Sequence, residues 1–365
     1  MPNPNTPPAA PILRFHEETL REYCWKLLAA HGAPEAHARI VGDSLVAANL
    51  RGVDSHGIQM MTLYLGQLKA RGMDPAEEGA VAHESGCCLT YDGKNGLGQV
   101  VADRCAAHAA RLVAGSGMGM VVARNSNHFG TAAYWAEKIA RSGAIGIAMC
   151  NSSPAVPPWQ GRSPRLGTNP IAIAVPGSDP ARFQFDMATT TVALGKVGNA
   201  AFRGEPTIPA KWGFLDSEGN PTTDTAAAQK GLPTPIGGYK GTGLAMMVEV
   251  LCSVLSGGPI SLDVPSYRGR KTEVPLQISQ MFLAIDPARF MPLPLFEART
   301  GHLKELIKSS EPARGYTEVL VAGEPERRAS QERARDGIPV PGPLWEQLAA
   351  AGRELNVIAP SPDAP

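Results

Sequence analysis

Apolar residues recur at helical spacing in the N-terminal part of the chain. Three stretches, 16–31, 34–50 and 60–72, carry apolar residues three or four positions apart, as a helix with one buried face requires. The pattern predicts three helices that pack against one another. Residues 1–11 are rich in Pro, Asn and Ala and offer little to bury, so we expect a disordered tail there.

From residue 81 onward, short apolar runs alternate with helical stretches. The pattern predicts strands at 118–123, 144–150, 170–175, 183–186, 280–285 and 317–321, and helices at 98–114, 131–142, 237–255, 296–308 and 325–336. This alternation is typical of an α/β or α+β fold. We expect a helical lobe over 12–80, joined by C-terminal helices within 325–355, and a mixed α/β region over 81–324.

Composition narrows the classes of partner. The formal net charge is zero and no block of Lys or Arg occurs, which disfavours nucleic acid and a membrane surface. No apolar run approaches the ~20 residues of a membrane span, and no signal peptide is evident. The six cysteines lack metal-ligand spacing and are expected as reduced thiols of a cytoplasmic protein, with no metal site. A small molecule or another copy of this chain is the expected partner.

The segment 50–57, Leu-Arg-Gly-Val-Asp-Ser-His-Gly, gathers several reactive groups at the end of a predicted helix. The imidazole of His56 titrates near neutral pH, and a neighbouring hydroxyl such as that of Ser55 can fix its tautomer. Proton transfer by His56 is therefore one interpretation. The other is a helix cap built by Asp54 or Ser55, with His56 at the surface. The local residues alone leave both open.

A dinucleotide protein of the common kind would show Gly-x-Gly-x-x-Gly between a strand and a helix, and this chain has no clean example. Instead, donor-rich loops occupy 125–130, 151–154, 167–170 and 186–191. Such loops and helix N-termini bind phosphate and carboxylate well, so together they indicate a phosphate-bearing cofactor. Each loop taken singly is more typical of a helix cap or a turn.

Five motifs at compatible spacing carry a resemblance: 51–57 (RGVDSHG), 126–130 (SNHFG), 167–170 (GTNP), 186–189 (DMAT) and 237–241 (GGYKG). In this order they resemble the malate/L-lactate dehydrogenase family, from about Leu20 to about Pro339. The resemblance implies a non-Rossmann fold with a helical lobe and a mixed-sheet nucleotide-binding lobe, a homodimer, NAD or NADP as cofactor, and 2-oxo or 2-hydroxy acids as substrates.

The resemblance also implies roles for single residues. His56 matches the proton donor or acceptor of the family, with Ser55 as its relay partner, and His128 matches a histidine that lies at the cofactor and is the acid/base in some branches. Thr168 falls at the substrate. The positions that match cofactor contacts are His128, Phe129, Gly130, Ser152, Asp186, Met187, Ala188, Lys240, Gly323, Glu324 and Pro325. The alternative for Lys240 is a solvated surface lysine.

One position departs from the family pattern. Many relatives carry an Arg that clamps the substrate carboxylate four residues after the active-site histidine, where this chain has Met60. A thioether cannot replace a guanidinium. Either another cation binds the carboxylate, with Arg51 and the catalytic candidate Lys196 available, or the substrate is more apolar than malate.

Three hypotheses on function stay open. The first is a 2-oxo acid/2-hydroxy acid oxidoreductase. The second is a reductase of cyclic imino acids of the piperideine-2-carboxylate type, against which Lys196 argues, because that branch has an acidic residue there. The third is a dinucleotide-binding protein without turnover, which the retained Ser55, His56, His128 and Lys240 disfavour.

Overall fold

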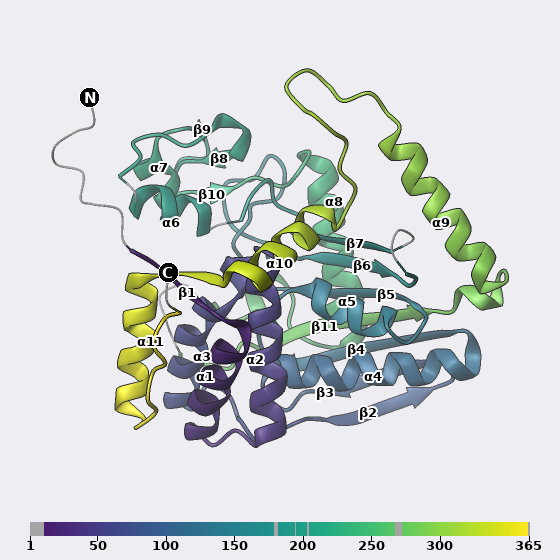
Figure 1. Ribbon diagram of the computed structural model, residues 1–365, viewed down its shortest axis with the longest axis horizontal. Helices are drawn as coiled ribbons and strands as arrows, with labels where there is room; N and C mark the ends of the chain where they lie inside the picture. The colour runs from purple at the N-terminus through teal and green to yellow at the C-terminus, as the bar shows by residue number, and fades with distance from the viewer. Residues whose placement is uncertain (1–10, 179–181, 194, 203, 267–271, 364–365) are drawn as a thin grey trace.

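The computed structural model describes residues 11–178, 182–193, 195–202, 204–266 and 272–363. A helical lobe and a sheet-centred lobe lie side by side, each with its own apolar core (Figure 1). The helical lobe is built from both ends of the chain. Its elements are β1 (Ile12–Phe15), α1 (Glu17–Ala30), α2 (Glu35–Leu50), α3 (Met61–Lys69), β12 (Ile338–Pro341) and α11 (Gly342–Glu354).

The core of the helical lobe forms where the apolar stripes of its helices meet. Leu27 of α1 and Leu45 of α2 are fully buried, as their helical spacing predicts. The strands β1 and β12 pair antiparallel, and this pairing brings Trp345 of α11 to 4.2 Å from Phe15, measured between ring centroids. The C-terminal elements therefore complete a core that the N-terminal helices begin.

A seven-stranded sheet organises the other lobe. Its order is β2-β3-β4-β11-β5-β6-β7, and every neighbouring pair is antiparallel except β3 and β4. The strands are β2 (Ala80–Ser85), β3 (Cys88–Asp92), β4 (Met118–Ser126), β5 (Ile145–Cys150), β6 (Ile171–Val175), β7 (Phe183–Met187) and β11 (Ile278–Ile285).

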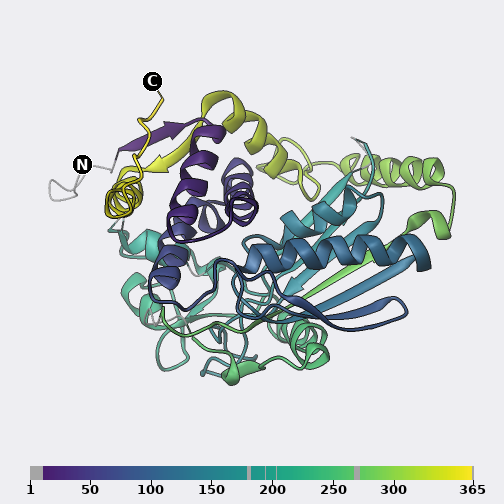
Figure 2. The same cartoon turned by 90° about the horizontal axis from the view of Figure 1, so that it is seen from below.

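Helices cover both faces of this sheet. Val121 of β4 faces α4 (Gly98–Ser116) and α5 (Ala132–Ala140), while its neighbour Val122 packs with Val248 of α8 (Tyr239–Glu249). This alternation follows from the two-residue period of a strand. Figure 2 shows α4 lying along the strands. A π-helical turn, Val250–Val254, continues α8.

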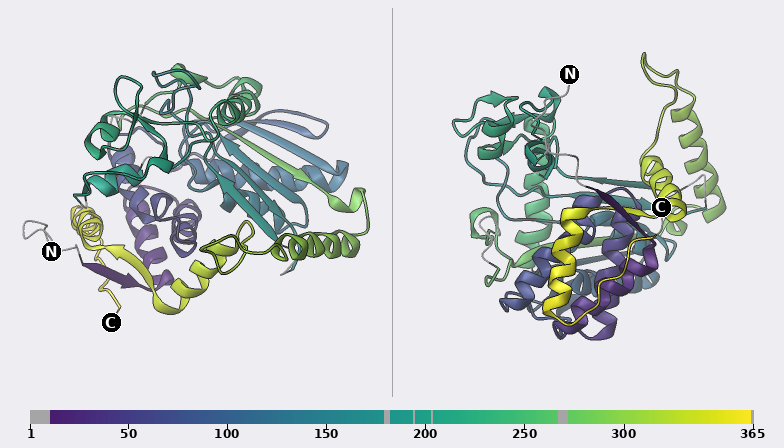
Figure 3. Two further views of the ribbon diagram at one scale, coloured as in Figure 1. Left: turned by 90° about the horizontal axis from the view of Figure 1, so that it is seen from above. Right: turned by 60° about the vertical axis from the view of Figure 1, so that its left-hand side comes forward.

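Three further parts complete the fold. A small unit holds α6 (Gly195–Phe202), β8 (Phe214–Leu215), β9 (Pro221–Thr222), α7 (Thr225–Lys230) and β10 (Leu232–Pro233). The helices α9 (Leu293–Lys308) and α10 (Glu324–Asp336) lead back to the helical lobe. Figure 3 shows the small unit and α9 on opposite sides of the molecule. No described helix is long and apolar enough to span a membrane.

Most predicted helices and strands form within a few residues of their expected bounds, but the strand predicted at 317–321 is wrong. This segment instead leads into α10, where the Val321 N–H donates to the Glu324 carboxylate at 3.2 Å. Within the described part of the chain, residues 317–321 belong to no sheet. The helix predicted from 296 begins earlier, at Leu293, because Pro292 and Pro294 suit a helix start. Most of the tail predicted at 1–11 lies outside the described residues.

Candidate active site

A short 3-10 turn, Asp54–His56, follows α2 and carries the predicted proton-transfer residues. Asn49, in the last turn of α2, fixes its shape. The Asn49 amide donates to the Asp54 carboxylate at 2.7 Å, and its Oδ1 accepts the Ile58 N–H at 2.8 Å. Gly57 is required because a Cβ there would lie 2.2 Å from Asn49 Oδ1.

Helix α10 restrains the same turn from the other end of the chain. Arg333 donates from Nη1 and Nη2 to the two oxygens of Asp54, at 2.6 and 3.0 Å. Such a bidentate pair fixes orientation as well as distance. Asp54 is thereby committed to Arg333 and Asn49, so it anchors the turn instead of pairing with His56.

Ser55 and His56 form the hydroxyl–imidazole pair that the sequence predicted. Ser55 Oγ lies 2.9 Å from His56 Nδ1, which leaves Nε2 of His56 for another partner. Burial lowers the pKa of His56 below its usual value. The neutral ring is therefore favoured at neutral pH, ready to accept a proton.

The second histidine, His128, follows the end of β4 in a loop that buried polar groups hold in place. Asn127 donates its amide to the Gly96 carbonyl at 2.9 Å, and Trp135 Nε1 donates to the Phe129 carbonyl at 2.7 Å. Gly98 lets α4 begin against this loop, since a Cβ there would lie 2.3 Å from the carbonyl oxygen of His128.

The two imidazoles lie together although they come from different lobes. The ring centroids of His56 and His128 are 5.6 Å apart and the ring planes differ by 26°. Burial, with a smaller contribution from His56, lowers the pKa of His128 to about 3. One positive charge beside another is costly at this distance, so the pair carries at most one proton in excess near neutral pH.

Polar partners surround Nδ1 of His128. The Tyr64 hydroxyl of α3 lies 2.6 Å away, and the Gly130 N–H donates to the same nitrogen at 3.3 Å. Gln99 of α4 donates from Nε2 to the Tyr64 oxygen at 2.9 Å. Helix α3 thus contacts Nδ1 of His128 directly through Tyr64, and α4 supports that contact through Gln99.

Three of the predicted cofactor and substrate loops, 151–154, 167–170 and 186–191, meet beside β5 and β6. Ser152 Oγ accepts the Thr168 N–H at 3.0 Å, and Thr189 donates its N–H and hydroxyl to the Thr168 carbonyl at 2.9 and 3.0 Å. Asp186, at the end of β7, accepts the Ala133 N–H in the first turn of α5 at 2.9 Å. Met187 and Ala188 follow it and are half-buried.

The electrostatics of Asp186 are unusual for a carboxylate. Asp186 is an exposed residue near the end of β7, but the protein packed around it removes part of its hydration and raises its pKa to about 6, against the opposite effects of the Ala133 N–H and of Arg51. With this raised pKa the carboxylate is still largely ionised at neutral pH, and it can accept hydrogen bonds from the hydroxyls of a ligand.

The cations proposed to bind a substrate carboxylate have protein partners. Arg51 pairs with Glu137 at 3.5 Å and donates to Gln184. Lys196 is exposed on α6, with Nζ 5.9 Å from the centroid of the Trp212 ring. Met60 is half-buried against the helical core. The ion pair and hydrogen bond of Arg51 thus lead away from the histidine pair, to Glu137 and Gln184.

The remaining predicted cofactor residues begin two helices. Lys240 is exposed in the first turn of α8, after Gly237 and Gly238 at positive φ. Glu324, between Gly323 and the exposed Pro325 at the start of α10, accepts from Lys308 at 2.7 Å and is thus engaged within the protein.

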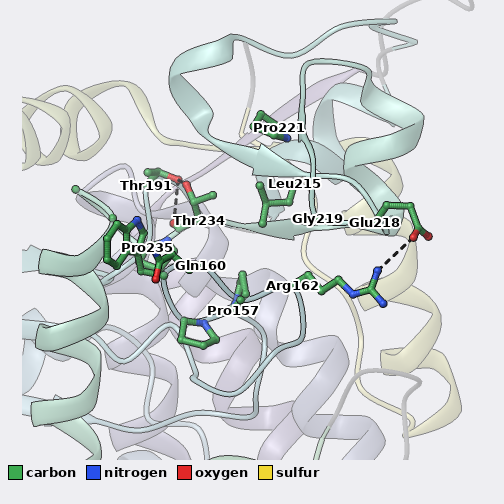
Figure 4. A pocket seen from close by; sticks show the side chains of 15 residues that line it. Pro157, Gln160, Arg162, Thr191, Leu215, Glu218, Gly219, Pro221, Thr234 and Pro235 are labelled. Atoms are coloured by element: carbon green, nitrogen blue, oxygen red, sulfur yellow. Dashed lines mark hydrogen bonds and ion pairs between the residues drawn. The ribbon is translucent and has the colours of Figure 1, made fainter.

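A pocket of about 620 Å³ lies between the loop 157–162 and the small unit, next to the start of α8 (Figure 4). Its walls include Trp159, Leu215 and Pro235. Arg162 at its rim pairs with Glu218 at 3.3 Å. Its lining contains none of the predicted site residues.

Sequence reasoning missed Tyr64, Gln99 and Arg333. Tyr64 was read as one apolar position in a helical stripe, and Gln99 and Arg333 stand in helices with no motif around them. Asn49, adjacent to the 50–57 motif, could have been found from its position, because Asn near a helix end bonds local backbone groups.

The geometry defines an acid–base site between a helical lobe and a mixed sheet that is not a Rossmann sheet. The chain belongs to the malate/L-lactate dehydrogenase family, whose model matches residues 15–349. It is a dehydrogenase of the kind that acts on CH–OH groups.

Two archaeal relatives are similar over nearly their whole length. The malate dehydrogenase of Pyrococcus horikoshii is 36% identical over 353 residues, covering 94% of this chain and 96% of that protein. The solved sulfolactate dehydrogenase of Methanocaldococcus jannaschii matches with a TM-score of 0.88 at 36% identity, covering 96% of this chain and 98% of that one. The expected mixed α/β, non-Rossmann fold is therefore confirmed.

More distant relatives differ in what they act on. The ureidoglycolate dehydrogenase (NAD(+)) of Escherichia coli K12 is 32% identical, covering 92% of this chain and 95% of that protein. The solved delta1-piperideine-2-carboxylate reductase of Pseudomonas syringae pvar. tomato is 25% identical with a TM-score of 0.81, covering 93% and 99%. The family thus includes both dehydrogenases and an imine reductase.

Proposed function

We propose that this protein is an NAD(P)-dependent oxidoreductase that transfers a hydride between the nicotinamide and a 2-oxo or 2-hydroxy acid. The observation that carries the proposal is Ser55 Oγ at 2.9 Å from His56 Nδ1, with the ring of His128 stacked beside it. That arrangement supplies a proton donor with a fixed orientation, which carbonyl reduction requires.

The chain's own residues fit a dinucleotide. Lys240 and the N-terminus of α8 suit the pyrophosphate, the Asp186 carboxylate suits ribose hydroxyls, and Ser152 offers a hydroxyl between two loops. The bound nicotinamide would supply the hydride. The family membership and an NAD(+)-dependent relative support this choice of cofactor.

The proton steps belong to His56. In the direction of reduction, His56 acts as the imidazolium: it donates the Nε2 proton to the oxygen on which charge develops and is left neutral, with the Nδ1 proton donated to Ser55 Oγ in both states. A positioned acid of this kind contributes about 10²- to 10⁴-fold. In oxidation the same nitrogen removes the hydroxyl proton.

The substrate is proposed to be more apolar than malate. Met60 packs on the helical core at the position where many relatives carry an arginine, and Arg51 is engaged by Glu137 and Gln184. A substrate with one carboxylate and an apolar side chain suits this environment better than a dicarboxylate.

The test is oxidation of NADH and of NADPH with a panel of 2-oxo acids: pyruvate, oxaloacetate and phenylpyruvate. We expect turnover with an apolar 2-oxo acid and less with oxaloacetate. Piperideine-2-carboxylate belongs in the same panel, because the similarity to an imine reductase favours that second candidate. Turnover confined to the imine would overturn the 2-oxo acid assignment, and cofactor binding without turnover would overturn both.

We also propose a homodimer. The outer side of α8 and its π-helical turn exposes apolar side chains, among them Met246 and Val254 at 52% and 55% exposure. An apolar surface of this kind on a helix commonly marks an interface, and two-fold dimers are the commonest oligomers. Sedimentation should give a dimer that Met246→Glu weakens, with Met118→Glu, also exposed but on β4, as the control.

A further inference from the structure

A chain of buried polar groups runs from α4 through α3 to His128. Gln99 Nε2 lies 2.9 Å from the Tyr64 oxygen, and that oxygen lies 2.6 Å from His128 Nδ1. Tyr64 and Gln99 are each only 1% exposed, in surroundings that are otherwise largely apolar. Buried polar contacts of this kind are costly unless each group is paired, so their arrangement restricts which atom carries each proton.

The direction of the chain follows from one backbone group. The Gly130 N–H points at His128 Nδ1 from 3.3 Å, and a backbone amide can only donate. This contact is longer than an ordinary hydrogen bond and is weak by itself, but it favours Nδ1 as the acceptor and so sets the direction of the shorter Tyr64 contact. The Tyr64 hydroxyl must then donate to Nδ1 as well, while Gln99 donates to the Tyr64 oxygen.

We propose that Tyr64, oriented by Gln99, is a positioning residue that holds His128 as a neutral imidazole with its proton on Nε2. His128 then offers an N–H on the ring edge away from Tyr64, suited to the carbonyl oxygen of a substrate. It acts there as a hydrogen-bond donor, and proton exchange is left to His56. The inference rests on the proposed function for its catalytic meaning, but the protonation pattern itself does not depend on it.

The charges around His128 agree with this assignment. The titratable groups recorded against its ring are His56, stacked at 5.6 Å, and Tyr64. Neither is an anion that could stabilise an imidazolium at His128. When His56 is a positively charged imidazolium, it repels a second positive charge, so the neutral form of His128 is favoured in that state.

The direct test is the nitrogen NMR spectrum of the full-length protein labelled with ¹⁵N-histidine, with His128 assigned by its loss in His128→Gln. We expect one protonated nitrogen on His128, Nε2, throughout the pH range 5 to 8, a window that brackets the ordinary histidine pKa. In Tyr64→Phe only the long Gly130 contact remains at Nδ1, so the preference should weaken to a mixture in which the Nδ1–H tautomer is detected. A proton on Nδ1 in the unaltered protein would overturn the proposal.

Gln99→Glu is the sharper variant, because it keeps every ring in place. A carboxylate at position 99 would accept the Tyr64 hydroxyl proton and turn it away from His128. The mixed tautomers of Tyr64→Phe should therefore reappear although the hydroxyl is still present. If Gln99→Glu leaves the Nε2–H form intact, Tyr64 only fills space and the proposal fails. Gln99→Glu also tests the proposal if Tyr64→Phe does not fold.

Tyr23→Phe is the matched control. Tyr23 is a buried tyrosine of the same core whose hydroxyl donates to the Leu348 carbonyl at 2.8 Å, remote in sequence from both histidines. It should lose stability without changing the tautomer of His128. With a substrate found, kcat should fall about tenfold in Tyr64→Phe, with KM for the dinucleotide nearly unchanged, since partners that fix a ring tautomer act at about this scale. Tyr23→Phe should leave kcat unchanged.

The two readouts separate this inference from the proposed function. If no 2-oxo acid or imine is turned over but the NMR pattern is as expected, the proposed function fails and the protonation assignment stands. If turnover is found but His128 carries its proton on Nδ1, the proposed function stands and the role of Tyr64 is overturned.

Discussion

At the scale of single residues, two histidines of similar chemistry receive different environments. His56 has a hydroxyl at Nδ1, which can donate or accept, whereas His128 has the Gly130 amide, which can only donate. The first environment permits either direction of the hydrogen bond at Nδ1, whereas the second, together with the Tyr64 hydroxyl, favours an unprotonated Nδ1. The two rings lie side by side, so it is their different hydrogen-bond partners that distinguish their roles.

The first prediction concerns His56→Ala. If His56 moves the proton, turnover should fall by at least about 100-fold while dinucleotide affinity, measured by fluorescence titration, stays within about twofold. His302→Ala, at an exposed histidine on α9, is the control and should change neither. Unchanged turnover in His56→Ala would transfer the acid/base role to His128.

The second prediction concerns acid stability. The pKa of His128 is about 3 in the folded protein and near 6.5 when unfolded, so the unfolded chain binds the proton more tightly. Stability is therefore full above the unfolded value and falls as pH drops from about 6.5 towards 3, by about 1 kcal/mol per pH unit from this residue. Urea unfolding at pH 7, 6 and 5 should show a shallower loss in His128→Gln. An equal slope would contradict the lowered pKa.

Sequence reasoning identified residues whose role is local and missed those whose role depends on contact. Ser55 and His56 are adjacent, so their pairing could be expected from the chain itself. Tyr64 and Gln99 lie 64 and 29 positions from His128, and their helices also offer ordinary apolar stripes. No periodicity distinguishes a tyrosine that fills a core from one that aims its hydroxyl at a histidine.

At the scale of elements, the active-site turn is held by helices from both ends of the chain. Asn49 in α2 sets its shape and Arg333 in α10 holds its carboxylate. Helix α10 was predicted within one residue of its observed start, yet its contact with Asp54 was not, because charged residues on a polar helix carry no signal of where they dock. The strand wrongly predicted at 317–321 shows the opposite case, in which a local apolar pattern is present but the segment pairs with no strand of the described sheets.

The third prediction follows from this contact. Arg333→Ala should lower kcat about tenfold or more, because the Asp54 carboxylate loses a bidentate partner and the turn that orients His56 loosens. Arg333→Lys should recover only part, since an ammonium cannot bind both oxygens in the same way. Hydrogen exchange should show faster exchange over residues 54–60.

Arg328→Ala is the control for that variant. Arg328 lies on the same helix and makes a similar two-bonded pair, but with the exposed Glu318, where ion pairs contribute little. It should leave kcat and the exchange of 54–60 unchanged. If both variants lose activity equally, the effect belongs to α10 as a whole and not to Asp54.

At the scale of the whole molecule, two features could not be predicted from the sequence: the order of the strands in the sheet, and the pairing of the two ends of the chain that completes the helical lobe. Five of the seven strands of the sheet, all but β2 and β3, could be predicted from their apolar runs. The placement of β11 between β4 and β5 is a long-range pairing that no local pattern encodes. The same holds for β1 and β12, which join the two ends of the chain. The site depends on this closure, since His56 belongs to the helical lobe and His128 to the end of β4.

The last prediction tests that dependence. Trp345 of α11 is 7% exposed and packs on Phe15 and Tyr23, so Trp345→Ala should cost about 3–5 kcal/mol of unfolding free energy. Trp159→Ala, at a tryptophan that is 51% exposed, should cost far less. Because α11 completes the lobe that carries His56, Trp345→Ala should also lower kcat at temperatures where the protein is still folded. Lost stability with an unchanged kcat would mean that the histidine pair is held by the turn, Asn49 and Arg333 alone, and that closure by the C-terminal elements serves stability only.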